Sequence, residues 1–237
     1  MALTAGFQAA AQAVEISTEK AMALLENLSE NAPKCSKLAY RSFAFSKSTV
    51  PVEEVHGIHI TDGRNHFVNI EGQGSSLLTE EFTVSIDSTG QTIMVSQPEE
   101  AFFRSFPYSP ALSDSSSALE SKFKSITMDG DGDTGQLTFF FFAESQHQSA
   151  SFKYAEGVLQ SVTTQFNWVD NTTADPTEQY EPKLEMAITP MYRCDSVLPF
   201  LKVSHFLNRS GPEIDLADRY RSFQFLDLRY SPSSNPN

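Results

Sequence analysis

The sequence predicts a single α+β domain in which antiparallel strands predominate. Three observations support this prediction: one amphipathic helix near the N-terminus, a series of short strand-like segments joined by polar turns, and a length of 237 residues, which suits one domain better than two. The apolar fraction of 40%, with 19 phenylalanines, is enough to build a core. Because short hairpin-linked strands are also typical of β-sandwiches, that fold is the structural alternative.

Residues 15–30 are predicted to form the helix. Ala21, Leu24, Leu25 and Leu28 recur at helical spacing, and Pro33 ends the segment. The apolar stripe needs a surface to pack on, and the sheet is the simplest one.

Strands follow the helix at short intervals. Turn signals at residues 62–65 and 87–90 separate two pairs of them and predict β-hairpins. In the first half of the chain we expect strands at residues 38–46, 55–61, 66–70, 81–86 and 91–96. In the second half we expect strands at residues 124–128, 136–144, 151–154, 158–169, 183–190 and 220–228, with a helical turn after Pro199 in the segment 196–208.

Residues 97–120 are predicted to connect the two halves, and residues 170–182 to form a polar loop. The connection carries an aromatic block, residues 102–108, that is too apolar for a solvated linker. Residues 15–230 thus make one β-rich domain, and residues 231–237 are expected to form a disordered tail.

The run of four phenylalanines at residues 139–142 is the strongest single signal. Successive side chains of a strand point to opposite faces, so this run makes both faces of its strand apolar. One face then covers an ordinary core. The other requires a cover as well, and a helix, a second sheet, a ligand or a partner protein would each supply it.

Composition excludes several functions. A net charge of −13 disfavours nucleic acids and anionic membrane surfaces, both of which attract basic patches. No apolar run reaches 18 residues, so no transmembrane segment is predicted. Cys35 and Cys194, 159 positions apart, fit no metal motif, and either form a disulfide in an oxidising compartment or remain two buried thiols.

No catalytic or metal motif is complete, so we expect a protein that is not an enzyme and needs no cofactor or metal. The acidic run at residues 129–133 lacks the glycine and glutamate of a calcium loop and predicts a hairpin turn. His56 and His59 fall on opposite faces of a strand, which argues against a shared metal. With His66, they are expected to be exposed hairpin residues.

The order of strands and turns resembles the LolA/LolB-like superfamily of periplasmic lipoprotein carriers. The stretches that carry the resemblance are HGIHITDGRNHFVNIEG, EEFTVSIDSTGQTIMVSQP, FKYAEGVLQSVTTQFNW and KLEMAIT, and the likeness spans roughly residues 15–230. It implies a curved, unclosed antiparallel half-barrel, covered by the N-terminal helix, with an apolar concave face that binds lipid chains. No individual lid or cavity residue is carried over from the family.

The leading hypothesis is therefore non-catalytic binding or carriage of a hydrophobic ligand, a lipid or an acylated peptide, on an apolar concave face. The alternative is a structural or adaptor subunit of a larger assembly, in which exposed phenylalanines form a protein interface. The aromatic residues predicted to bind the ligand are Phe102, Phe103, Phe106, Phe139, Phe140, Phe141, Phe142 and Trp168.

The resemblance implies a periplasmic or secreted protein, with a cytoplasmic location as the alternative. Residues 1–13 end in Ala11-Gln12-Ala13, which resembles a signal-peptidase site, but they lack a charged region and an apolar core. We treat residues 1–14 as an N-terminal segment that is either the remnant of an export signal or the start of a helix.

Overall fold

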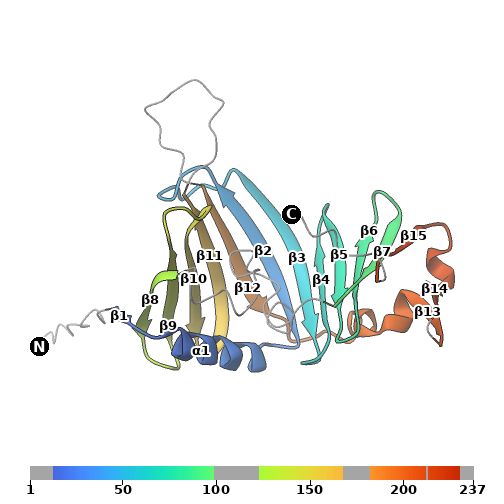
Figure 1. Ribbon diagram of the computed structural model, residues 1–237, viewed down its shortest axis with the longest axis horizontal. Coiled ribbons are helices and arrows are strands. Elements are labelled where there is room, and N and C mark those ends of the chain that lie inside the picture. Colours follow the sequence, from blue (N-terminus) through green and yellow to red (C-terminus); the bar gives the residue numbers. More distant parts are fainter. Residues whose placement is uncertain (1–12, 99–122, 168–181, 212, 230–237) are drawn as a thin grey trace, which may run out of the picture.

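The structure of the chain is a computed structural model that describes residues 13–98, 123–167, 182–211 and 213–229 (Figure 1). Four of the aromatic residues predicted to bind a ligand lie outside these ranges: Phe102, Phe103, Phe106 and Trp168. The predicted tail, residues 231–237, and most of the N-terminal segment also lie outside them.

The described elements follow the predicted order of a helix, a first group of strands and a second group. The first half contains β1 (Val14–Glu15), α1 (Thr18–Glu30), β2 (Cys35–Phe43), β3 (Glu53–Thr61), β4 (His66–Ile70), β5 (Gly74–Leu78), β6 (Thr83–Asp87) and β7 (Thr92–Ser96). The second half contains β8 (Phe123–Gly130), β9 (Gly135–Phe141), β10 (His147–Ala155), β11 (Val158–Phe166), β12 (Lys183–Pro190) and the C-terminal elements η3 (Leu198–Leu201), η4 (Val203–His205), β13 (Leu207–Ser210), β14 (Glu213–Leu216), η5 (Asp218–Tyr220) and β15 (Gln224–Asp227).

Thirteen of the described strands form one open sheet in the order β1-β8-β9-β10-β11-β12-β2-β3-β4-β5-β6-β7-β15. All neighbours are antiparallel except β15, which runs parallel to β7. Two meanders, β8–β12 and β2–β7, are joined by the antiparallel pair of β12 and β2. The sheet curves without closing, which confirms the predicted α+β half-barrel rather than the β-sandwich (Figure 1).

Helix α1 forms where the apolar spacing predicts it. The Ser17 hydroxyl caps its N-terminus by accepting a hydrogen bond from the backbone N–H of Lys20 at 3.3 Å. Ala21, Leu25 and Leu28 are buried, and they lie on one face of the helix at positions i, i+4 and i+7. Asn31 ends the helix two residues before Pro33.

The register defines two faces of the sheet. We call the side that carries Leu38 and Phe139 the helix face, because α1 packs there. We call the opposite side, which carries Ile60 and Phe67, the C-terminal face. Residues paired directly across neighbouring strands share a face, so the register assigns each strand residue to one of them.

The two cores of the molecule lie on opposite faces of this one sheet. On the helix face, the buried residues of α1 pack on the meander β8–β12 and on β2, in a cluster that includes Phe139, Phe152 and Met186. On the C-terminal face, the segment after β12 packs on β3–β7, in a cluster that includes Phe67 and Phe206. The apolar side of the sheet therefore changes from one face to the other near β2.

A disulfide between Cys35 and Cys194 covalently links the C-terminal segment to β2. The sequence left open whether these cysteines pair, and the structure pairs them, with 6.1 Å between their Cα atoms. The backbone supports the same junction, because the Met191 N–H donates to the Cys35 carbonyl. Closing a loop of 159 residues stabilises a folded state by about 5 kcal/mol in the chain-entropy model.

The structure departs from the prediction at the C-terminal end and at one hairpin. The strand expected at residues 220–228 is divided into η5 and the four-residue β15, because the backbone turns between Tyr220 and Phe223. Strand β5 lies between the strands expected at residues 66–70 and 81–86, in a stretch for which we predict no strand. Its residues Gly74, Ser75 and Ser76 have low strand propensity, and pairing on both sides holds them in the sheet.

Candidate ligand-binding hollow

Strand β9 separates the phenylalanine run into two pairs. Phe139 and Phe141 point to the helix face and are buried, with 0% and 7% of their surfaces exposed. Phe140 points to the other side and is 38% exposed, and Phe142, which follows the strand, is 44% exposed. The strand thus carries phenylalanine on both faces, but the side chains of the run do not share one surface.

Phe139 and Phe141 belong to the closed core beneath α1. Phe123 contacts both of them, with ring centroids 4.9 Å from Phe139 and 5.2 Å from Phe141. Phe152 on β10 meets the Phe139 ring edge-on at 5.8 Å. These contacts are those of a packed aromatic core.

Phe140 is surrounded by polar residues on the C-terminal face. It pairs directly with Ser125 of β8 and Ser149 of β10. The Ser149 hydroxyl donates in turn to the Gln165 side chain at 3.2 Å. Phe140 is therefore an apolar side chain on a polar part of the sheet.

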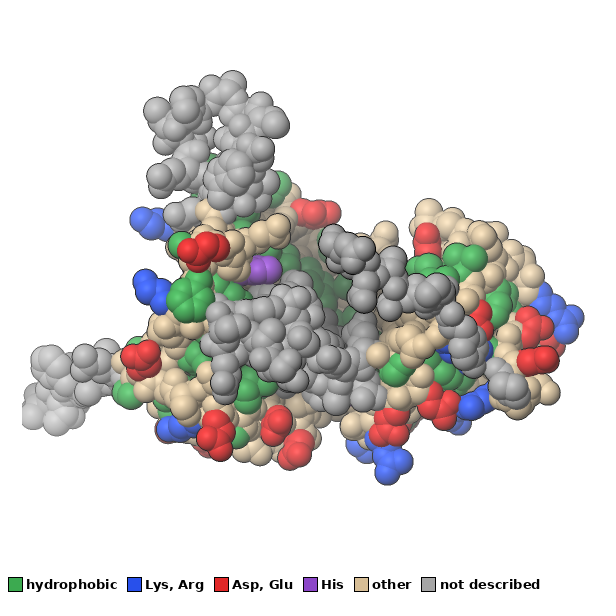
Figure 2. Space-filling model, viewed as in Figure 1, with side chains coloured by type: hydrophobic (Ala, Val, Ile, Leu, Met, Phe, Trp, Pro, Cys, Tyr) green, Lys and Arg blue, Asp and Glu red, His purple; other side chains and the backbone are tan. Residues whose placement is uncertain are grey.

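A hollow opens on the viewed face of the molecule, and apolar side chains are visible inside it (Figure 2). The register places four half-buried residues on the helix face of β2, β3 and β4, beside the core under α1: Tyr40, Val55, Val68 and Ile70. Tyr40 pairs directly with Val55, and both Tyr40 and Val68 pack against the core cluster. We call these four residues the hollow floor, after the hollow that we propose they line.

Tyr40 adds one polar group to this floor. Burial raises the pKa of Tyr40 to about 12, because the phenolate is poorly hydrated there. The side chain is therefore a neutral phenol at physiological pH. It offers a hydrogen-bonding hydroxyl within an otherwise apolar surface.

His59 and His66 lie beside the hollow floor and are buried, so the expectation that they are exposed hairpin residues is wrong for both. Their rings stack with centroids 5.5 Å apart, and His59 Nε2 lies 3.3 Å from His66 Nδ1. Desolvation, followed by the proximity of His66, lowers the pKa of His59 to about 3. Sequence alternation separates His56 from His59 correctly, but it does not reveal that α1 and the loop after it cover this end of the sheet.

A pocket of about 490 Å³ borders the histidine pair where α1 ends. Acidic side chains from the helix and from the β3–β4 turn line it, together with one lysine: Glu26, Glu30, Asp62 and Lys34. Within the described ranges, no three His, Cys, Asp or Glu side chains are placed to hold a metal ion.

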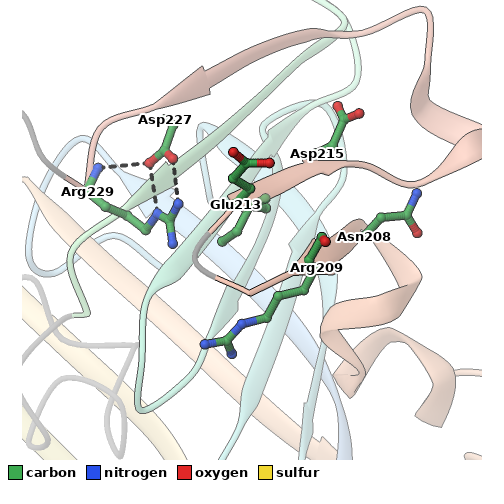
Figure 3. A pocket seen from close by; sticks show the side chains of 8 residues that line it. Asn208, Arg209, Glu213, Asp215, Asp227 and Arg229 are labelled. Carbon is green, nitrogen blue, oxygen red and sulfur yellow. Dashed lines mark hydrogen bonds and ion pairs between the residues drawn. The ribbon is translucent and has the colours of Figure 1, made fainter.

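A second pocket, of about 880 Å³, lies on the C-terminal hairpin β13–β14 and beside β15 (Figure 3). Its lining is charged and its cations are already paired. The Arg229 guanidinium donates to both carboxylate oxygens of Asp227, and this lowers the pKa of Asp227. Arg209 pairs with Glu81 of the β5–β6 turn. This lining does not fit a hydrophobic ligand, so the hollow is the better candidate.

Comparison with known proteins gives a likeness at the level of overall shape. No family model and no curated protein match the sequence. An uncharacterized conserved protein from Thermus thermophilus has a TM-score of 0.42 at 9% identity, covering 88% of this chain and 99% of its own. A LolA superfamily protein from Nitrosomonas europaea has a TM-score of 0.31 at 9% identity, covering 75% of this chain and 96% of its own. LprF from Mycobacterium bovis has a TM-score of 0.27 at 11% identity, covering 74% of this chain and 94% of its own. At these scores the likeness carries no inference about function.

No helix among the described residues is both long enough and apolar enough to span a membrane.

Proposed function

We propose that this protein binds a hydrophobic ligand, a lipid or an acylated peptide, in the hollow on its helix face, and that it does so without catalysing a reaction. The observation that carries the proposal is the half-buried apolar floor formed by Tyr40, Val55, Val68 and Ile70. Burying apolar area there contributes about 25 cal/mol per Å² to affinity. The core under α1 holds one side of the floor rigid.

We further propose that the protein works in an oxidising compartment, periplasmic or secreted. The Cys35–Cys194 disulfide supports this location, because such bonds persist where thiols are not kept reduced. Membership of the lipoprotein-carrier superfamily remains a prediction from the order of strands and turns.

A second candidate function is that of an adaptor subunit in a protein assembly. The exposed Phe140 on the C-terminal face and the exposed Phe142 just after β9 favour it, because aromatic residues are enriched at protein interfaces. This surface lies on the opposite side of the sheet from the hollow, so the two functions can be tested separately.

Native mass spectrometry of the purified protein, followed by analysis of its organic extract, tests ligand binding first. We expect a co-purifying adduct of lipid size, and after its removal we expect binding of the uncharged dye Nile red. Val55→Asp and Ile70→Asp place a charge in the hollow and should weaken dye binding roughly tenfold, because an apolar ligand would desolvate the carboxylate.

Ala187→Asp provides the matched control. Ala187 is also half-buried in the central part of the sheet, but the register places it on the C-terminal face. The Ala187→Asp substitution should leave dye binding unchanged. If the native mass equals that of the protein alone, and the protein also does not bind the dye, the ligand-binding function is excluded. Concentration-dependent oligomers that Phe140→Ser and Phe142→Ser disperse would instead support the adaptor subunit.

A further inference from the structure

The chemical character of the helix face changes along the sheet. From β8 to β12 the register places almost only apolar side chains on it. From β5 to β7 most of the side chains that it places there carry hydroxyl groups: Ser76, Thr83, Ser85, Thr92 and Ser96. The buried Leu78, which pairs with Thr83, and the exposed Met94, which pairs with Ser85, share this face. The hollow floor lies between these two regions.

The apolar floor and the hydroxyl groups are contiguous. Val68 of the floor pairs directly with Ser76 of β5, and Ser76 pairs with Ser85 of β6. Neighbouring strands are about 4.8 Å apart, so the change from apolar to hydroxyl surface occurs within one or two strand spacings. A single elongated molecule lying across the strands would contact both regions.

Charged groups are scarce on this face. The register of the described strands assigns it two, Glu53 and Asp87, and both are exposed at strand ends. Lys124 lies in the bulge of β8 and has no cross-strand partner there among the described strands. Strand cations such as Arg41 and Lys183 fall on the C-terminal face. An anionic head group would therefore find no counter-charge beside the serines on the described strands, whereas a cation would find Asp87, two residues from Ser85 on the same face.

Two further groups near the serines are neutral and buried. Thr83 is 5% exposed, and its hydroxyl oxygen is a buried polar atom that has no hydrogen-bond partner in the described part of the chain. His59, which pairs directly with Val68, is enclosed with His66 and is uncharged at neutral pH. A buried hydroxyl without a partner is costly, and a ligand that supplied one would offset that cost.

We propose that the ligand is an amphiphile whose head group bears hydroxyl groups and carries no negative charge. Its chain lies along the hollow floor, and its head group hydrogen-bonds to Ser76, Thr83 and Ser85. At the opposite margin, the acidic pocket beside His66 disfavours an anionic head group. This head-group site presupposes the ligand-binding function proposed above.

Calorimetric titration of the delipidated full chain with three amphiphiles of equal chain length tests the proposal. The probes are 1-monododecanoylglycerol, dodecanoate and dodecylammonium, each below its micelle concentration. We expect the glyceride to bind at least roughly tenfold more tightly than dodecanoate, because the carboxylate loses hydration without gaining a counter-charge. Dodecylammonium should also bind more tightly than dodecanoate, because Asp87 and the acidic pocket attract a cation.

Thr83→Val removes the hydroxyl and retains the shape. It should weaken glyceride binding roughly three- to tenfold, leave Nile red binding unchanged and not lower the melting temperature, since the hydroxyl it removes is unsatisfied among the described residues. Ser76→Ala combined with Ser85→Ala should act in the same direction. Thr163→Val is the control, because Thr163 lies on the C-terminal face of β11.

Equal or tighter binding of dodecanoate would overturn the head-group proposal, and so would variants that leave glyceride affinity unchanged. In both cases Nile red binding would still support the hollow as a hydrophobic site. If neither the three amphiphiles nor Nile red bind, the ligand-binding function itself is excluded.

Discussion

Phe140 and Phe141 are neighbours with the same side chain, and their environments differ completely. Phe141 is buried beneath α1, whereas Phe140 is 38% exposed on the opposite face. Phe141→Ala should lower the free energy of unfolding by about 3–5 kcal/mol, because it leaves a cavity in a packed core. Phe140→Ala should cost less than about 1 kcal/mol. Urea unfolding of the two variants measures both values, and equal losses would contradict the assignment of faces.

His59 makes stability depend on pH. Its pKa is about 3 in the folded protein against an ordinary value of 6.5, because burial and the nearby His66 disfavour the imidazolium. Between these values the unfolded chain binds a proton that the folded protein does not. Stability should therefore fall as pH falls below 6.5, by up to about 1.4 kcal/mol per pH unit.

His59→Gln should remove this dependence, reducing the loss of stability between about pH 6.5 and pH 5 by about 2 kcal/mol. Chemical denaturation at both pH values measures the difference. His56→Gln, which changes a histidine on the exposed side of the same strand, is the control. An unaltered pH dependence in His59→Gln would show that the ring is hydrated in the folded protein.

Among the elements, those defined by local sequence were predictable. Helix α1 follows from the spacing of Ala21, Leu25 and Leu28, and the β3–β4 and β6–β7 hairpins follow from their turn residues. The pairing of β12 with β2 was not predictable, because it joins segments roughly 140 residues apart and depends on the whole sheet.

The candidate site was less predictable than the fold. The phenylalanine run identifies a strand with two apolar faces, but three of its neighbours in space, Ala21, Leu25 and Phe152, decide which face is closed. The hollow floor consists of four residues on three strands, one on β2, one on β3 and two on β4. Its only local signal is ordinary strand alternation, so the register was needed to bring these residues together.

The N-terminal cap of α1 gives a prediction for a single element. Ser17→Ala removes the hydrogen bond that the Ser17 hydroxyl accepts from the Lys20 N–H, and should lower the free energy of unfolding by about 1 kcal/mol. Ser17→Asp keeps an acceptor at the same place and should restore the stability. Thermal unfolding followed by circular dichroism measures both. If the alanine and aspartate variants were equally stable, the cap would contribute nothing.

On the scale of the whole molecule, one curved sheet supports two cores on opposite faces. Within the described residues, each half of the sheet is therefore covered on one side, by α1 or by the C-terminal segment. On the helix face of β2–β4, the half-buried residues of the hollow floor adjoin the core under α1. We therefore expect the ligand beside that core, on the face of the sheet opposite to the C-terminal segment (Figure 2).

The C-terminal cover depends on the Cys35–Cys194 disulfide, since this bond attaches it to β2. Replacing both cysteines with alanine should lower the free energy of unfolding by about 2–5 kcal/mol. Guanidinium unfolding of the variant and of the wild type, each with and without reductant, measures the loss. Hydrogen exchange should then quicken first in β13, β14 and their contacts on β3–β7, while α1 and β8–β12 stay protected. Uniform exchange across both halves would show instead that the two cores unfold as one unit, and that the sheet joins them more strongly than the disulfide joins the cover to the sheet.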